Sequence, residues 1–258
     1  MEAYVHKWLD IYRRNVDLFL FASEFMARKT EEFWGKQSFE WDLLRNPFDA
    51  TSFVAPPEPG DYVLYFGRLI DEKGVDVLLE AARAIESVPV VIVGDGPDRE
   101  KLERRAADLD IRNVSFLGAK WGDELDEILG NCRFVVVPSL WHENFPYVIL
   151  QSFAMGKPVV GTDRGGIPEL VAHEERGLIY PARCPDSLAS AVQRLWDDES
   201  QVRRMGLAAK AYADAHPQQA PLITVNSWNE WTETSYLHPC TMYGYGYLDA
   251  VKRVFGGS

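Results

Sequence analysis

The chain has 258 residues, 47% of them hydrophobic, which is enough for one large domain or two small ones with a buried core. Its formal net charge of −12 argues against binding to long nucleic acids or to an anionic membrane surface, because the field of the whole protein repels both. Three scattered cysteines without a C-x-x-C pair, no long apolar run and no signal-peptide pattern predict a cytoplasmic protein without disulfides, a zinc site or a transmembrane segment.

The first 50 residues predict a short α/β segment that is distinct from the rest of the chain. Its expected elements are a helix over 1–15, a strand over 16–21, a helix over 23–34 with Ser23 as its N-cap, and a strand near Leu43. Pro47 and the run Pro-Pro-Glu-Pro-Gly at 56–60 then mark a linker.

From residue 62 onward, short apolar runs alternate with segments of helical period. The expected strands are 62–66, 88–93, 114–117, 134–138, 158–162 and 177–180. The expected helices are 75–85, 97–109, 123–129, 146–155, 186–197 and 200–216. Strands that are apolar on both faces and are separated by helices predict a parallel sheet covered on both sides, so the fold class is α/β with a doubly wound, Rossmann-like sheet.

The last part of the chain changes character again. It is rich in aromatic residues and glycine, as in Tyr243-Gly-Tyr-Gly-Tyr247, and predicts an irregular tail. We therefore expect the chain to divide into 1–50, 51–216 and 217–258.

The first candidate for a binding site follows the strand over 62–66. The strand ends at Gly67-Arg68, and a helix begins just after Lys73-Gly74. Ligands of open α/β sheets lie at such strand ends, and a free helix N-terminus favours anions, so Arg68 and Lys73 are candidates to bind a diphosphate. The same pattern also fits a plain strand–turn–helix with two solvated cations.

Two further candidates follow later strands. Glu143 and Gln151 lie two helical turns apart after the strand over 134–138, so both can face one cleft and hydrogen-bond a sugar, although a solvated loop glutamate fits equally. Gly165-Gly166 precedes a helix that begins with proline and predicts either a backbone N–H nest for an anion or a tight turn. His142 and His173 are candidates for catalysis, but a structural role for both is the simpler interpretation.

In this order the motifs resemble the C-terminal, donor-binding domain of retaining GT-B glycosyltransferases of group 1, or family 4. The resemblance covers about residues 16–216 and is most specific in the E-x7-E region at 143–151. Its other motifs are Ser23-Glu24, Asn46-Pro-Phe-Asp49, Gly67-Arg68 with Lys73-Gly74, Val93-Gly-Asp-Gly-Pro97, Phe116-Leu-Gly118 and Gly165-Gly166-Ile-Pro-Glu169.

The resemblance implies a nucleotide-sugar donor as substrate, with no metal and no separate cofactor. Arg68 and Lys73 are expected to neutralise the diphosphate and the charge that develops on it as the glycosidic bond breaks, and Glu143 is expected to orient the donor sugar. The other residues expected to contact the donor are Gly67, Gly94, Gly118, Asn144, Phe145, Pro146, Gln151, Gly165 and Gly166.

The sequence departs from the family pattern in two places within this region. The second glutamate of the motif is Gln151, which implies donor binding weaker by about 1–2 kcal/mol because an amide lacks the charge and one acceptor. Only about 45 residues resemble the end of the N-terminal domain that normally binds the acceptor. We therefore expect a separate acceptor-domain partner, or self-association through the apolar face left uncovered.

The tail resembles the C-terminal end of WbsX-like proteins, which are related to endo-mannosidase barrels. Glu230 and Glu233 lie where such a barrel could use a carboxylate. The favoured hypothesis is a glycosyltransferase component that transfers sugar with retention to a glycan or lipid-linked acceptor. The alternatives are a non-catalytic nucleotide-sugar-binding module and a fragment of a glycoside hydrolase.

Overall fold

The computed structural model describes residues 16–56, 58–216, 229–230 and 235–236. The chain divides into two units, Met1–Gln219 and Ala220–Ser258. In the second unit, β9 (Asn229–Glu230) pairs antiparallel with β10 (Ser235–Tyr236). The predicted helix over 1–15, Glu233 and most of the aromatic tail lie outside the described residues, and the division at residues 50 and 216 stays a prediction.

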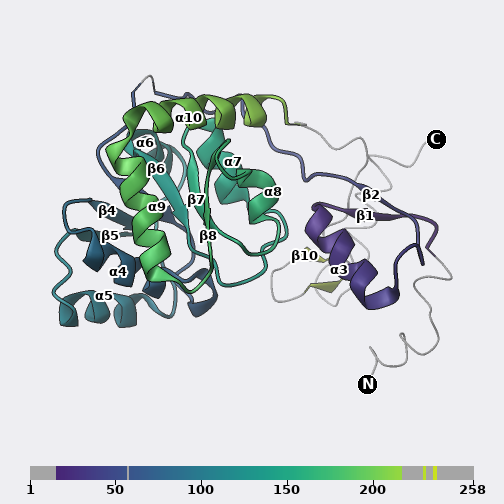
Figure 1. Ribbon diagram of the computed structural model, residues 1–258, viewed down its shortest axis with the longest axis horizontal. Helices are drawn as coiled ribbons and strands as arrows, with labels where there is room; N and C mark the ends of the chain where they lie inside the picture. Colours follow the sequence, from purple (N-terminus) through teal and green to yellow (C-terminus); the bar gives the residue numbers. More distant parts are fainter. Residues whose placement is uncertain (1–15, 57, 217–228, 231–234, 237–258) are drawn as a thin grey trace. The chain divides into compact units, whose positions relative to one another are not determined.

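The first unit contains the predicted doubly wound sheet (Figure 1). Its six strands are all parallel and lie in the order β5-β4-β3-β6-β7-β8. Their bounds are β3 Val63–Phe66, β4 Val90–Val93, β5 Val114–Gly118, β6 Phe134–Val137, β7 Val159–Thr162 and β8 Gly177–Tyr180. The order reverses between β3 and β6, which are adjacent in the sheet although they are first and fourth along the chain.

Helices cover both faces of this sheet. They are α4 Val75–Ala84, α5 Arg99–Asp108, α6 Asp123–Asn131, α7 Tyr147–Ala154, α8 Ile167–Val171, α9 Pro185–Asp197 and α10 Glu199–Asp214. Alternate residues of β3 enter two separate cores: Val63 and Tyr65 pack with α4 and α9, and Leu64 and Phe66 pack with α7 and α8. A central strand buried on both faces must be apolar at every position, which is why its sequence shows a continuous run.

The ends predicted for the helices after residue 62 agree with the structure within two residues, and α5 shows one of the two-residue differences. Pro97 does not open this helix: Pro97 and Asp98 form a turn, and the helix begins at Arg99. A short 3-10 helix, η1 (Asp71–Lys73), also lies in the connection between β3 and α4, where no helix was expected.

The segment before the linker forms β1 (Phe19–Phe21), α3 (Glu24–Trp34) and β2 (Trp41–Leu43). β1 and β2 pair in parallel, as a βαβ crossover requires. Ser23 is the N-cap of α3, as predicted, and its Oγ accepts a hydrogen bond from the Met26 amide at 3.3 Å. Among the described residues, no helix is long and apolar enough to cross a membrane.

Candidate functional site

The candidate residues gather at the carboxyl ends of β3 and β6. Open α/β sheets bind ligands in the crevice outside the strand ends where the strand order reverses, and here this point lies between these two strands. Both strands are fully buried, so the first residues that can meet a ligand are those in the connections after them.

The connection after β3 exposes one cation. The Tyr65 hydroxyl donates to the Arg68 carbonyl at 2.8 Å, and the Gly67 amide donates to the Val93 carbonyl at 3.0 Å. Burial, with a smaller effect of the Glu143 charge, raises the pKa of Tyr65, so its hydroxyl keeps its proton and holds the turn. Arg68 is exposed, and among the described residues no carboxylate pairs with it.

Lys73 and Glu143 meet across the two connections. Lys73 Nζ lies 2.5 Å from Glu143 Oε1, and the Ser139 hydroxyl donates to the same oxygen at 2.8 Å. The two charged side chains are 28% and 15% exposed, so the pair is partly screened from water yet open to a ligand on one side. Two of the three predicted catalytic residues, 70 positions apart in the sequence, are therefore in direct contact.

Main-chain contacts fix the two connections against each other. The Glu72 carbonyl accepts hydrogen bonds from the amides of Leu140 and Trp141, at 2.8 and 3.1 Å. A Cβ on Gly74 would lie 2.1 Å from the Pro138 carbonyl oxygen, so only glycine permits this approach. Main-chain hydrogen bonds and the close approach at Gly74 thus hold Lys73 and Glu143 near each other.

Three predicted glycines line up along the same edge. Gly67, Gly94 and Gly118 lie at the ends of β3, β4 and β5, and the Gly94 amide donates to the Gly118 carbonyl at 2.9 Å. A Cβ on Gly94 would lie 1.8 Å from the Gly67 carbonyl oxygen. The Arg99 guanidinium lies beside Gly118, where its Nη1 would be 3.2 Å from a Cβ.

The glycine pair Gly165-Gly166 was expected to form either an anion nest or a tight turn, and one of its two amides has a partner within the protein. The Gly166 amide donates to the Glu143 carbonyl at 2.7 Å and is therefore occupied. A Cβ on Gly165 would lie 2.1 Å from the Glu143 oxygen, and one on Gly166 would lie 2.2 Å from the Asn144 oxygen. The pair instead supports the main chain of the loop that carries Glu143.

The side chains that follow Glu143 in this loop contact other parts of the protein. Asn144 Oδ1 accepts a hydrogen bond from Ser23 Oγ at 2.6 Å, and the buried Phe145 ring stacks on His216 with centroids 5.6 Å apart. Pro146 occupies the N-cap position of α7. Among the described residues, neither the Asn144 amide nor the Phe145 amide has a hydrogen-bond partner, so the backbone of the loop is what it can offer a ligand.

The remaining predicted residues are Gln151 and the two histidines. Gln151 is half-buried on α7, and its side chain has no hydrogen-bond partner within the described part of the chain. The His142 ring stacks on Phe25 at 5.4 Å, and His173 Nδ1 accepts from the Ile179 amide at 2.9 Å. Both histidines thus have structural partners.

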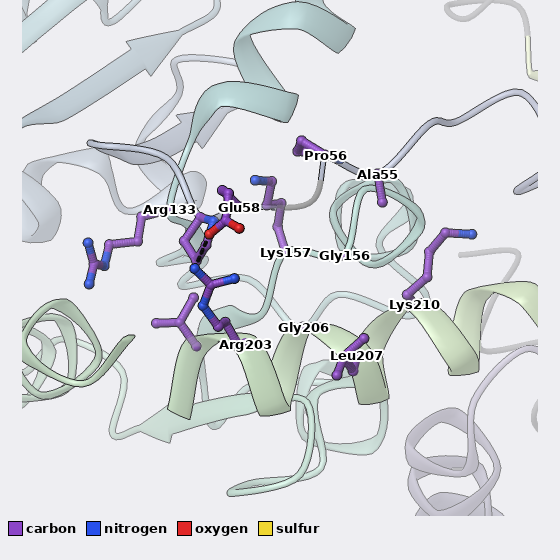
Figure 2. A pocket seen from close by; sticks show the side chains of 12 residues that line it. Ala55, Pro56, Glu58, Arg133, Gly156, Lys157, Arg203, Gly206, Leu207 and Lys210 are labelled. Carbon is purple, nitrogen blue, oxygen red and sulfur yellow. Dashed lines mark hydrogen bonds and ion pairs between the residues drawn. The ribbon is translucent and has the colours of Figure 1, made fainter. Parts of the chain in front are cut away.

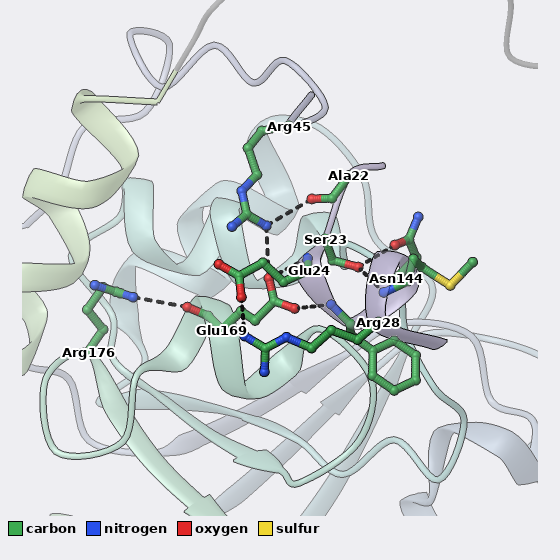
Figure 3. Close-up of polar contacts among 10 residues, drawn as sticks. Ala22, Ser23, Glu24, Arg28, Arg45, Asn144, Glu169 and Arg176 are labelled. Carbon is green, nitrogen blue, oxygen red and sulfur yellow. Dashed lines mark hydrogen bonds and ion pairs between the residues drawn. The ribbon is translucent and has the colours of Figure 1, made fainter. Parts of the chain in front are cut away.

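Sequence reasoning gave no role to Ser139 or to Glu169, although Glu169 ends one of the motifs that carry the resemblance. Ser139 is buried two residues after the end of β6. A polar residue so close to the end of a buried strand is a signal in the sequence that could have identified it. Glu169 accepts hydrogen bonds from the amides of Glu24 and Phe25, at 3.0 and 2.5 Å (Figure 3). No local sequence pattern predicts the contact of Glu169 with these amides, because they lie about 145 residues earlier in the chain.

A separate hollow of about 220 Å³ lies near the amino ends of β6 and β7, away from the carboxyl ends that hold the candidate residues (Figure 2). Arg133, Lys157 and Arg203 line it, and Arg203 pairs there with Glu58. Burial lowers the pKa of Lys157, whose Nζ donates to the Cys132 carbonyl at 2.8 Å. The hollow is smaller than the pockets of about 300–1,000 Å³ that hold drug-sized ligands, so it is a poor candidate for a nucleotide sugar.

Two family models match this chain. The model of group 1 glycosyl transferases matches residues 50–212. The model of glycosyltransferase WbsX matches residues 197–251, most of which lie outside the described residues.

Curated relatives match the same region. The uncharacterized glycosyltransferase MJ1607 of Methanocaldococcus jannaschii is 38% identical over 141 residues, which are 53% of this chain and 36% of that protein. D-rhamnosyltransferase WbpZ of Pseudomonas aeruginosa is 34% identical over 152 residues, 58% of this chain and 40% of that protein. A GDP-mannose-dependent alpha-(1-6)-phosphatidylinositol monomannoside mannosyltransferase of Mycobacterium tuberculosis is 32% identical over 164 residues, 59% and 43% respectively. The matched region thus spans about two fifths of the length of these relatives.

Solved structures share the fold. Sucrose-phosphate synthase of Thermosynechococcus elongatus superposes with a TM-score of 0.70 at 25% identity, over 78% of this chain and 54% of that one. Anabaena HepE in complex with UDP and glucose gives 0.71 at 22% identity, over 84% and 63%. The predicted α/β class, of the kind found in GT-B glycosyltransferases, is confirmed.

Proposed function

We propose a function from the family to which the chain belongs, the group 1 glycosyl transferases. In this proposal the chain binds a nucleotide-sugar donor at the carboxyl ends of β3 and β6 and serves retaining sugar transfer. The observation that carries the proposal is the meeting of Lys73 and Glu143 beside the exposed Arg68, at the point where the strand order reverses.

Arg68 and Lys73 bind the donor diphosphate in this proposal. The global charge of −12 repels such an anion, so binding depends on local cations. Each charge-assisted hydrogen bond contributes about 1.5–3 kcal/mol. The same two cations stabilise the charge that grows on the diphosphate as the glycosidic bond breaks, which accelerates transfer without a metal ion.

Glu143 orients the donor sugar, together with the unpaired amides of Asn144 and Phe145. Its Oε1 is held by Lys73 and Ser139, which leaves Oε2 to accept from a sugar hydroxyl. Gln151 binds the ribose diol with one acceptor fewer than a glutamate has. The complexes of HepE with UDP-glucose and with UDP support a donor of this chemical class, although base and sugar stay open.

We also propose that an acceptor-binding partner, or a second copy, packs against the segment around β1, because Val16, Leu18 and Leu20 expose apolar side chains there. A glycan or lipid-linked acceptor and a cytoplasmic location stay predictions.

One alternative function needs only the donor site. A nucleotide-sugar-binding module without turnover would use the same contacts around Lys73 and Glu143. Incubation of the pure protein with labelled UDP-, GDP- and ADP-sugars and cell-extract acceptors separates the two, because any transfer by this chain alone excludes the module. The glycosidase hypothesis rests on Glu230 in β9 and on Glu233, which is not described, and nothing further supports it.

The donor site is tested by removing both cations. Arg68→Ala/Lys73→Ala is expected to weaken binding of UDP or GDP, whichever binds the wild-type protein in calorimetry, by at least about a hundredfold, since two charge-assisted contacts are lost. Lys29→Ala/Arg112→Ala removes two exposed cations elsewhere and is expected to leave the affinity unchanged. Equal affinities of the wild type and the first variant refute the assignment.

A further inference from the structure

Glu169 links two distant parts of the first unit. Its carboxylate accepts hydrogen bonds from the amides of Glu24 and Phe25, and Arg45 Nη1 lies 3.1 Å from its Oε2 (Figure 3). Those two amides belong to the first turn of α3, where a helix has no carbonyl of its own to pair with. A carboxylate from α8 therefore completes the N-terminus of a helix that lies far earlier in the chain.

The turn that Glu169 holds also contacts the Glu143 loop. Ser23, at the N-cap of α3, is fully buried and donates its hydroxyl hydrogen to Asn144 Oδ1 at 2.6 Å. Phe25 stacks on the His142 ring, with an angle of 6° between the planes. The first turn of α3 thus contacts the residues on both sides of Glu143.

The opposite side of the loop is held by the segment that leads into α8. The Gly166 amide donates to the Glu143 carbonyl at 2.7 Å, and Gly166 lies three residues before Glu169. The Glu143 loop is therefore gripped between α3 and the start of α8, and Glu169 is the side chain that joins these two elements.

We propose that Glu169 is a positioning residue for the donor sugar: it anchors the first turn of α3, which fixes Asn144 and so sets the place of Glu143 and the free amides beside it. This inference rests on the proposed function of the donor site. Glu169 does not contact Arg68 or Lys73 directly and reaches Lys73 only through Glu143, so we expect its loss to act mainly on the sugar part of the donor.

The experiment compares the affinities for nucleotide and nucleotide sugar. Calorimetry on the full chain measures the Kd for UDP and UDP-glucose, and for GDP and GDP-mannose, in the wild type and in Glu169→Gln. The amide keeps the size of the side chain but offers one acceptor and no charge to the two helix amides and Arg45. The ratio of the two Kd values in the pair that binds reports the contribution of the sugar alone.

We expect Glu169→Gln to keep the affinity for the nucleotide within about twofold and to lose roughly tenfold in affinity for the nucleotide sugar, as for the loss of one or two hydrogen bonds. Ser23→Ala, which removes the contact with Asn144 at the other end of the same path, is expected to change the ratio in the same direction. Glu32→Gln, an exposed carboxylate on α3 that pairs with Lys29, is the control and is expected to keep the wild-type ratio.

The outcomes distinguish this inference from the function on which it rests. A wild-type protein that binds none of the four ligands overturns the proposed function and this inference together. Nucleotide binding with an unchanged ratio in Glu169→Gln and Ser23→Ala, or a wild-type ratio of one, overturns the positioning role alone. Should Glu169→Gln fail to fold, a wild-type ratio in folded Ser23→Ala overturns the role equally.

Discussion

Replacing Glu143 with glutamine is expected to tighten the binding of a bare nucleoside diphosphate. In the unliganded protein Lys73 donates to Glu143 Oε1 at 2.5 Å, so the carboxylate neutralises a cation that the diphosphate needs. Glu143→Gln keeps an acceptor near Lys73 but removes the negative charge, and it also removes the repulsion between this carboxylate and the phosphates.

The size of the effect depends on the burial of the pair. The two side chains are 28% and 15% exposed, so their interaction exceeds that of a fully solvated pair but stays well below the values of a dry interior. We expect a gain of about 1 kcal/mol in the binding of the nucleoside diphosphate, or roughly fivefold in Kd. For the nucleotide sugar we expect a smaller gain in affinity than for the bare nucleotide, because the variant has lost the Glu143 carboxylate that accepts from a sugar hydroxyl.

Calorimetry with the nucleotide and the nucleotide sugar that bind the wild type provides both numbers. In the Lys73→Met background, the gain caused by Glu143→Gln should shrink, because the cation that it frees is absent. Glu80→Gln, which removes the partner of Arg105 on α5, serves as the matched control and should leave both affinities unchanged. Weaker nucleotide binding in Glu143→Gln than in the wild type would refute the view that the carboxylate competes with the diphosphate for Lys73.

Three further predictions concern stability and assembly. Gly94→Ala should lower the free energy of unfolding by about 2 kcal/mol or more, because its Cβ would lie 1.8 Å from a carbonyl oxygen. Gly130→Ala, on α6 with open space around it, should instead raise the free energy of unfolding by about 0.5–1 kcal/mol. Urea unfolding of both variants tests this, and similar midpoints would contradict it. A hydrogen bond from an arginine of α9 lowers the pKa of Glu174 from its ordinary value of 4.5, so its contribution to stability is present above that pH and is lost as the pH falls through the lower folded-state value. Unfolding of Glu174→Gln should depend less on pH in this acid range, and an unaltered pH profile would rule the contribution out. Light scattering should find self-association of the wild type that Leu18→Asp/Leu20→Asp reduces, and a monomeric wild-type mass would count against it.

Much of the sheet can be predicted from local patterns in the sequence. The runs at 63–66 and 134–137 are apolar at every position, which requires strands covered on both faces, and the structure buries every residue of both. Ser23 before a helical period predicted the N-cap that the structure confirms. Arg68, Lys73 and Glu143 were candidates because they lie in the connections after two strands, and the resemblance to group 1 glycosyltransferases implied their roles.

Contacts between distant residues could not be predicted in the same way. Asn144 was expected to contact the donor, and the sequence did not show that its side chain meets Ser23, 121 residues away. The sequence left an anion nest and a tight turn both open for Gly165-Gly166, and it did not show that the Gly166 amide donates to the Glu143 carbonyl. Both contacts depend on which partner the packed chain brings near, and a local pattern holds no information about that partner.

The amino-acid order by itself determined which segments become buried strands, which faces of the helices are apolar, and which charged residues stand at strand ends, since periodicity and burial act within a few residues. Tertiary structure alone decided that β3 lies beside β6, that Lys73 reaches Glu143, and that Glu169 caps α3. Strand order and side-chain partners depend on how the whole chain closes its core, because buried polar groups must find partners wherever packing places them.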